Sequence, residues 1–283
     1  MKKGNFLFYG PPGGGKTTLG LSSFYDYRQN KLIRDGRWLR IGGESNTRMV
    51  LPDANVKHFT SPDTNPLEFS EQFDVYTKAL VAQAYKGKGP EVVFMDGLSE
   101  FNLLDIHEFT QKHGIGDDKW ARYDYARDQF IGAIKRLRAD TLNAFVIMSA
   151  RVDTRRKGIL NKKTGELTGD DPVWMDTRYV PAAAGFVRDN LGYYFDLIAY
   201  VDSDPGMVVL PDGTQAQGDH HKVYMRQGDN YLVKNVWADC WTVTKRPDYL
   251  TNPTFDDIVH ELEASQVEAT AIWAASKKGS ETK

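Results

Sequence analysis

The sequence has 283 residues, of which 41% are apolar and 26% are charged, so it is long enough to bury the core of an α/β domain. Its formal net charge of −2 excludes a strongly basic surface, and binding to nucleic acid would need a local basic patch. A single cysteine, Cys240, excludes an internal disulfide framework, and no apolar run of about eighteen residues predicts a membrane helix, so we expect a cytoplasmic protein without a membrane partner.

The first half of the sequence alternates short apolar runs with longer segments of helical character. The apolar runs predict buried strands at residues 5–9, 38–41, 91–96 and 144–148. The segments between them predict helices at residues 16–30, 68–85, 99–112 and 119–139. Strands that alternate with helices indicate an α/β fold, with a mostly parallel sheet covered by helices.

The pattern changes after residue 150. Residues 151–190 are basic, polar and rich in glycine, and they predict a flexible loop insertion because they lack a helix or strand period. Turn residues then separate short apolar runs, which predicts antiparallel hairpins with strands at 193–202, 207–210, 222–226 and 231–236. Thr254 and Asp257 form a capping-box pattern that opens a helix to about residue 276. We expect a single domain over residues 1–262, followed by the helix end and a frayed tail at 263–283.

Residues 10–20, GPPGGGKTTLG, fit the phosphate-binding pattern G-x-x-x-x-G-K-[ST] between a predicted strand and a predicted helix. The glycines let backbone N–H groups point at phosphate oxygens, and the helix N-terminus adds partial positive charge. Lys16 is expected to reach the β- and γ-phosphates, and Thr17 to offer its hydroxyl to Mg²⁺. The predicted nucleotide-binding residues of this P-loop are Gly10, Pro11, Pro12, Gly13, Gly14, Gly15, Lys16, Thr17 and Thr18.

A site of this kind also needs a carboxylate near the metal. Asp96 ends an apolar strand at the position expected for that carboxylate, and we expect it to hold Mg²⁺ through water. The next residue is glycine, so the group that activates water must come from elsewhere. Glu44 follows the second strand and is our candidate if that strand borders the Asp96 strand, with Glu100 as the alternative. Ser149 ends a third strand and is expected to contact the γ-phosphate through its hydroxyl.

The P-loop, the segment 41–45 that contains Glu44, and the strand that ends in Asp96 together resemble the RecA/RadA-like ATPases. The segments 120–149, 195–199 and 231–235 are similar to phage-encoded RecA-like nucleotide-binding proteins, which are associated with single-strand annealing and recombination. The resemblance covers about residues 4–262. It implies a RecA-like core, ATP as the nucleotide, and hydrolysis with Glu44 as the base.

The same resemblance implies a homo-oligomer in which one subunit donates a basic finger to the site of its neighbour. Lys234, on the last predicted hairpin strand, matches the finger lysine. The basic residue that is common two positions later is Val236 here, and Arg226 on the preceding strand is the substitute. For both cations the alternative is a solvated side chain on a hairpin.

In RecA-like proteins the loop after the strand that ends here at Ser149 contacts DNA. This loop carries six cations within residues 151–163: Arg151, Arg155, Arg156, Lys157, Lys162 and Lys163. Cations on a loop can follow a phosphate backbone and release counterions on binding. The resemblance therefore implies single-stranded DNA as a partner, together with a single-strand annealing or ssDNA-binding protein. A solvated loop is the alternative.

Two other functions use the same phosphate cradle. A nucleotide-controlled protein-interaction module, such as a loader or packaging accessory, needs hydrolysis only as a switch. A small-molecule kinase would use residues 151–163 as a lid over the phosphates. ATP hydrolysis measured with and without single-stranded DNA distinguishes both from a DNA-dependent ATPase.

Overall fold

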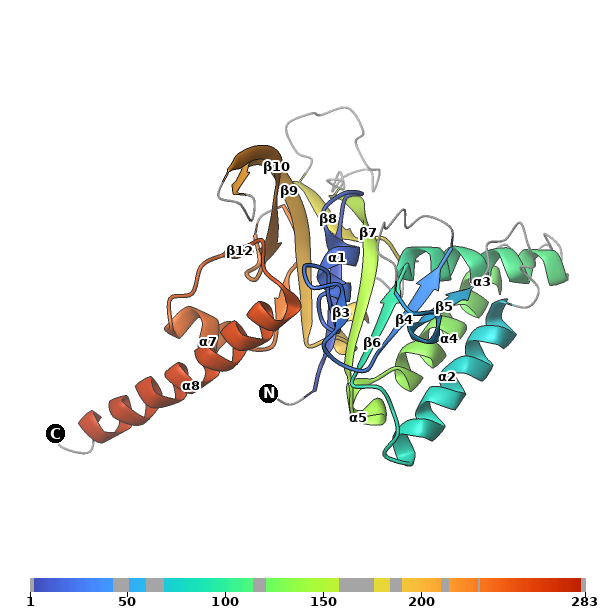
Figure 1. Cartoon of the computed structure of the whole chain (residues 1–283), viewed down its shortest axis with the longest axis horizontal. Coiled ribbons are helices and arrows are strands. Elements are labelled where there is room, and N and C mark those ends of the chain that lie inside the picture. The colour runs from blue at the N-terminus through green and yellow to red at the C-terminus, as the bar shows by residue number, and fades with distance from the viewer. Residues whose placement is uncertain are drawn as a thin grey trace, which may run out of the picture.

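The computed structural model describes residues 3–42, 51–59, 69–113, 121–157, 176–183, 190–209, 214–228 and 230–280. Figure 1 shows a central sheet with helices on both sides and a long C-terminal helix that extends away from the body. No helix in these ranges is both long and apolar enough to cross a membrane.

The main sheet has the strand order β12-β10-β9-β1-β7-β6-β4-β5, with β11 beside β9 and β8 beside β7. In this order, the neighbouring strands from β9 through β1, β7, β6 and β4 to β5 pair in parallel. The remaining strands pair in antiparallel fashion, and this arrangement confirms the predicted α/β fold. The parallel strands are β9 (Leu197–Val209), β1 (Asn5–Gly10), β7 (Phe145–Lys157), β6 (Val92–Asp96), β4 (Gly36–Ile41) and β5 (Val56–Phe59). The antiparallel strands are β12 (Tyr249–Thr251), β10 (Gln215–Tyr224), β11 (Lys234–Asn235) and β8 (Asp176–Pro181).

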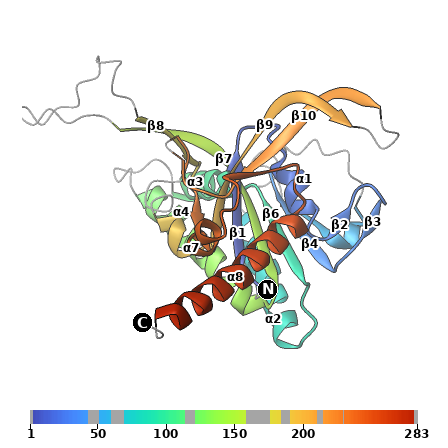
Figure 2. The same cartoon turned by 90° about the vertical axis from the view of Figure 1, so that its left-hand side faces the viewer.

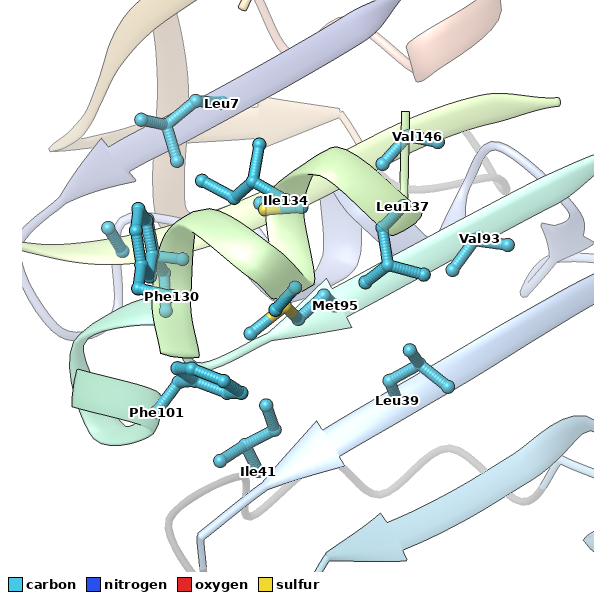
Figure 3. Close-up of a cluster of buried hydrophobic side chains, with 14 of the residues drawn as sticks. Leu7, Leu39, Ile41, Val93, Met95, Phe101, Phe130, Ile134, Leu137 and Val146 are labelled. Atoms are coloured by element: carbon cyan, nitrogen blue, oxygen red, sulfur yellow. The ribbon is translucent and has the colours of Figure 1, made fainter. Parts of the chain in front are cut away.

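Helices cover both faces of the sheet because alternate strand residues point to opposite faces. On β1, Leu7 and Tyr9 belong to the apolar cluster of one face, part of which is drawn in Figure 3, and Phe6 and Phe8 belong to the cluster of the other. The helices of the first face are α2 (Phe69–Tyr85), α3 (Leu98–His113), α4 (Ala121–Arg136) and α5 (Ala139–Leu142). Those of the second face are α1 (Lys16–Leu21), α7 (Ala238–Val243) and α8 (Phe255–Ser280).

The helix after the P-loop is shorter than predicted. It ends at Leu21 instead of continuing to residue 30, and the chain turns into the short strands β2 (Tyr25–Asp26) and β3 (Lys31–Leu32). The carboxylate of Asp26 accepts hydrogen bonds from two backbone N–H groups, those of residues 28 and 29, within this turn. Such a local side-chain bond competes with helix formation.

Two strands are longer than predicted. Strand β7 continues to Lys157, where a loop was predicted from residue 151, because it pairs with β8 over residues 152–157. Strand β9 passes through Pro205 and Gly206, where a turn was predicted. Pro205 lies beyond the residues of β9 that pair with β1, so its missing N–H interrupts no hydrogen bond on that side.

Helix α8 begins at the predicted capping box. The Asp257 carboxylate accepts hydrogen bonds from the backbone N–H and the hydroxyl of Thr254, both at 2.8 Å, and the Asp257 N–H donates to the Thr254 hydroxyl at 3.2 Å. The helix reaches residue 280, slightly beyond its predicted end. The predicted helices at 68–85 and 99–112 are confirmed, whereas the predicted helix at 119–139 is divided into α4 and α5.

Candidate functional site

The P-loop connects β1 to α1 as predicted, and the geometry explains why two of its positions are occupied by glycine. At Gly10, an added Cβ would lie 1.9 Å from the carbonyl oxygen of Val201 on the neighbouring strand β9. Gly15 has a φ of +89°, and an added Cβ would lie 2.7 Å from Nδ1 of His221 on β10. At Gly15 only glycine tolerates both the left-handed backbone and the close contact, and at Gly10 the close contact alone excludes a side chain. The sheet itself therefore determines the path of the loop.

Lys16 folds its side chain back across the P-loop. Its Nζ donates hydrogen bonds to the carbonyl oxygens of Gly10 at 2.9 Å and Pro11 at 2.7 Å. Burial lowers the pKa of this ammonium, while the nearby carboxylates of Asp96 and Glu100 act in the opposite direction. Phosphate oxygens are charged acceptors and bind an ammonium more strongly than neutral carbonyls do. The loop therefore holds a cation ready to exchange its two acceptors for phosphate.

Asp96 lies at the centre of a buried polar network. The Thr17 hydroxyl donates to Asp96 Oδ2 at 2.9 Å, and the Ser149 hydroxyl donates to Asp96 Oδ1. The N–H of Gly97 in turn donates to the Ser149 hydroxyl oxygen at 3.1 Å. Burial raises the pKa of Asp96, and the two hydroxyl hydrogen bonds partly offset this effect.

Strand order explains why these three side chains meet. Strand β7 lies between β1 and β6, and its Ser149 is in register with Phe8 on one side and Asp96 on the other. Parallel strands end at the same edge of a sheet, so the P-loop, Ser149 and Asp96 lie together there. The structure thus brings Thr17, Asp96 and Ser149 together, and the contact of Ser149 with a γ-phosphate stays a prediction.

The oxygen atoms of Thr17 and Asp96 suit a magnesium ion. Mg²⁺ prefers hard oxygen ligands and usually binds through one or two protein groups, water and the phosphates of a substrate. A hydroxyl and a carboxylate oxygen 2.9 Å apart beside the P-loop provide such a pair. A divalent cation would also favour the ionised form of Asp96, which burial alone disfavours.

A cavity of about 190 Å³, called the phosphate cavity below, opens over Lys16, Thr17 and Asp96. It is also lined by three charged residues that extend the site beyond the P-loop and Asp96: Arg40, Glu100 and Arg151. Arg151 Nη2 forms an ion pair with Glu100 Oε1 at 2.5 Å, and the Glu100 side chain is only 15% exposed. The cavity therefore contains enough positive charge to bind a polyphosphate, with a carboxylate beside it.

The sequence did not predict Arg40 as a residue of the site. It lies on β4 in register with Asp96 of β6, and its charge lowers the pKa of Asp96. The apolar run at 38–41 contains this residue, but only the pairing of β4 with β6 places it beside the carboxylate. Glu44 was a candidate base on the condition that the strand before it borders the Asp96 strand, and β4 does pair with β6. Glu44 itself lies outside the described residues. Glu100, the alternative to Glu44, lies in the cavity.

The two candidate finger cations lie outside this cavity within their own chain. The Lys234 ammonium donates to the carbonyl oxygens of Gly192 and Phe195, the latter at 2.6 Å, and burial lowers its pKa. Arg226 Nη1 pairs with Asp248 Oδ1 at 3.1 Å. Both residues therefore make structural contacts in the single chain, and their action in a neighbouring subunit stays a prediction.

The six predicted DNA-binding cations are divided by the structure. Arg151 lines the phosphate cavity, and its N–H donates to the Ser99 hydroxyl at 3.0 Å. The backbones of Arg155, Arg156 and Lys157 lie on the outer part of β7, opposite β8. Lys162 and Lys163 lie outside the described residues. A single strand thus leads from the phosphate cavity to the basic segment.

Comparison with known proteins identifies the domain that carries this site. A family model described as an AAA domain matches residues 2–236, which is most of the chain and includes the P-loop, Asp96 and β7. A search of curated proteins found no match.

Proposed function

Because the chain belongs to the AAA domain family of P-loop ATPases, we propose that it hydrolyses ATP and couples this reaction to single-stranded DNA. One observation carries the proposal. Strand β7 contains both Ser149, which binds Asp96, and Arg151, which lines the phosphate cavity, and it continues into the basic residues 155–157. Binding or hydrolysis of the nucleotide at one end of this strand would therefore alter the position of the basic residues at its other end.

In the proposed reaction, Lys16 exchanges the carbonyl oxygens of Gly10 and Pro11 for oxygens of the β- and γ-phosphates. Thr17 and Asp96 would hold Mg²⁺, which neutralises charge on the phosphate oxygens when bound. Ser149 keeps the Asp96 carboxylate in place through its hydroxyl. These residues mainly supply positioning and electrostatic stabilisation, which carry most of the catalysis in phosphoryl transfer.

Water must then be activated for attack on the γ-phosphorus. Its oxygen forms a bond to phosphorus, the bond from phosphorus to the ADP oxygen breaks, and a proton passes to a carboxylate. Glu100 is the described carboxylate suited to this step because it lines the cavity and pairs with Arg151. Arg151 would leave this pair to bind the γ-phosphate, which frees Glu100 to accept the proton. Glu44 is the other candidate, from its resemblance to the RecA-like base.

The proposed partner is single-stranded DNA, bound by the basic segment of β7 and the residues that follow it. A homo-oligomer would let Lys234 or Arg226 reach a neighbouring site, but Lys234 would first have to leave its two carbonyl partners. A phage recombination role with an annealing or ssDNA-binding protein follows from the resemblance in sequence.

The test is ATP turnover with and without single-stranded DNA, combined with mass measurement in each nucleotide state. We expect DNA to stimulate turnover, and Arg155→Ala/Arg156→Ala to weaken DNA binding while ATP turnover without DNA is unchanged. The slope of log affinity against log salt should fall by about 1.4, at roughly 0.7 for each DNA phosphate that the variant no longer neutralises. Lys86→Ala/Lys88→Ala removes two exposed cations just after α2 and is the matched control. The proposal would be contradicted if the rate of ATP turnover were the same with and without single-stranded DNA and the chain stayed monomeric in every nucleotide state.

A second candidate function has support from helix α8. This helix extends away from the body in Figure 1, and its outer part exposes the apolar side chains Val267, Ile272 and Trp273. Exposed apolar residues on such an extension suit a nucleotide-controlled protein-interaction module. Slow turnover that responds to a protein partner, and not to DNA, would identify this function.

A further inference from the structure

A second cavity, of about 230 Å³, also touches the P-loop, and Asp96 is not among the residues that line it. Gly15 and Thr18 line this second cavity, whereas Lys16 and Thr17 line the phosphate cavity. The P-loop and the first turn of α1 therefore separate two cavities of similar size. Figure 2 shows the β2–β3 hairpin next to α1, and the long β9–β10 ribbon above them. The turn of the hairpin and both strands of the ribbon contribute residues to the second cavity.

The chemistry of a triphosphate determines which part of a nucleotide each cavity would take. In a P-loop, the lysine reaches the β- and γ-phosphates, the threonine hydroxyl binds Mg²⁺, and backbone N–H groups hold the α- and β-phosphates. The γ-end therefore lies with Lys16, Thr17 and Asp96. The α-phosphate and the attached nucleoside must leave the loop at its other side, where Gly15 and Thr18 open into the second cavity.

One wall of the second cavity comes from the turn between β2 and β3, with the side chains of Tyr27 and Arg28. The Asp26 carboxylate holds the backbone of this turn through hydrogen bonds of 2.9 and 3.1 Å. Both side chains are exposed, and neither has a hydrogen bond or ion pair to another described residue. An aromatic ring and a guanidinium plane are the two protein groups on which nucleobases stack.

Other lining residues of the second cavity come from β10 and the turn after β12, namely Asp219, His221 and Asn252. The backbone N–H of His221 donates to Asn252 Oδ1 at 2.7 Å, which connects the two segments. The His221 ring packs against Gly15, and its buried Nδ1 has no hydrogen-bond partner within the described part of the chain. The exposed Asp219 carboxylate is an acceptor of the kind that binds ribose hydroxyls in other nucleotide sites.

We propose that this second cavity binds the nucleoside half of the triphosphate, with the base stacked on Tyr27 and Arg28 and the sugar or base donors bound by Asp219. This inference rests on the proposed function, because it takes the phosphate cavity as the site of the polyphosphate. It adds a recognition site that distinguishes a nucleoside triphosphate from a bare polyphosphate.

The test compares ATP with inorganic tripolyphosphate, both with Mg²⁺, by calorimetric titration of the full chain. Arg28→Ala/Asp219→Asn should lower the affinity for ATP roughly tenfold and leave that for tripolyphosphate unchanged, because only ATP has a nucleoside to lose. Tyr27→Ala should have the same selective effect. Both changes lie on exposed side chains, so the fold is retained.

Lys86→Ala/Asp239→Asn, which removes the same two kinds of charge from exposed positions outside the cavity, is the matched control and should alter neither affinity. Equal losses for ATP and tripolyphosphate in the cavity variants, or no loss for either, would overturn the inference. So would wild-type protein that binds tripolyphosphate as tightly as ATP, although the phosphate site would then stand. Protein that binds neither ligand would end the proposed function itself, so the two failures are distinguishable.

Discussion

Lys16 and Lys234 have similar local contacts in different surroundings. Each ammonium donates to two backbone carbonyl oxygens, and burial lowers the pKa of each. Lys16, however, lines an open cavity with the carboxylates of Asp96 and Glu100, whereas Lys234 lines none of the phosphate cavity. Two carbonyl partners therefore do not identify a functional lysine. The space beside the ammonium and the charges around that space do.

The comparison also separates two uses of hydrogen bonding. Lys234 joins β11 to the carbonyls of residues 192 and 195, which lie just before β9 in the sequence. These hydrogen bonds connect segments about forty residues apart. Lys16 bonds only to its own loop, five and six residues away. A bond within one loop can be exchanged for phosphate without opening the fold, whereas the bonds of Lys234 cannot be exchanged at the same low cost.

The largest expected effect comes from Lys16→Met, which keeps the aliphatic length and removes the charge. We expect ATP turnover to fall by about 10²–10³-fold or more, since a charge that stabilises the transferred phosphate is removed. Thermal unfolding should change little, because the hydrogen bonds that disappear lie within one loop. Steady-state phosphate release and a melting curve measure the two quantities. Retained turnover would remove the distinction between the two lysines.

The next effect concerns Asp96→Asn, which should reduce Mg²⁺-dependent turnover about 10²-fold and yet stabilise the protein without nucleotide. Burial raises the folded-state pKa of Asp96 above its unfolded value. Below the unfolded pKa both states are protonated and the carboxyl carries no penalty, and stability is lost as pH rises through the folded pKa. The variant should therefore gain stability over wild type at pH 7 and lose this advantage toward pH 3. Denaturant unfolding at both pH values measures it, and an equal difference at both would contradict the assignment.

The smallest effect is expected from Lys234→Met. The carbonyls of residues 192 and 195 lose their donor, which should lower the free energy of unfolding by about 1–2 kcal/mol, with ATP affinity unchanged. At roughly 2–4 °C per kcal/mol for a domain of this size, the melting temperature should fall by a few degrees. Lys86→Met, on an exposed surface, is the control. Loss of turnover in an assembled oligomer without loss of stability would instead establish Lys234 as a finger acting in trans.

The phosphate site could be predicted in large part from short segments. The spacing of Gly10, Gly15 and Lys16 after an apolar run identifies the P-loop, and an apolar run that ends in Asp96 identifies the metal carboxylate. The position of Ser149 follows in the same way. The prediction did not extend to Arg40, Glu100 and Arg151 as a connected set, because their meeting depends on strand pairing and on the start of α3.

The lengths of several elements were also beyond local prediction. Residues 151–157 have no regular apolar period, yet they form a strand because β8 supplies backbone partners. The segment after Leu21 has helical character in sequence, yet it turns because Asp26 bonds to the backbone beyond it. In each case a contact that the sequence pattern does not contain outweighs local propensity.

Glycine spacing, helix starts and alternating apolar residues act over a few residues, so the order of residues along the chain specifies the phosphate cradle and the α/β class of the fold. Strand order, register and burial arise from packing between distant segments. They place β7 between β1 and β6, bring Ser149 and Arg40 to Asp96, bind Lys234 to its carbonyls, and open a second cavity beside Gly15. Local chemistry thus defines what the site can hold, and long-range packing defines which side chains surround it.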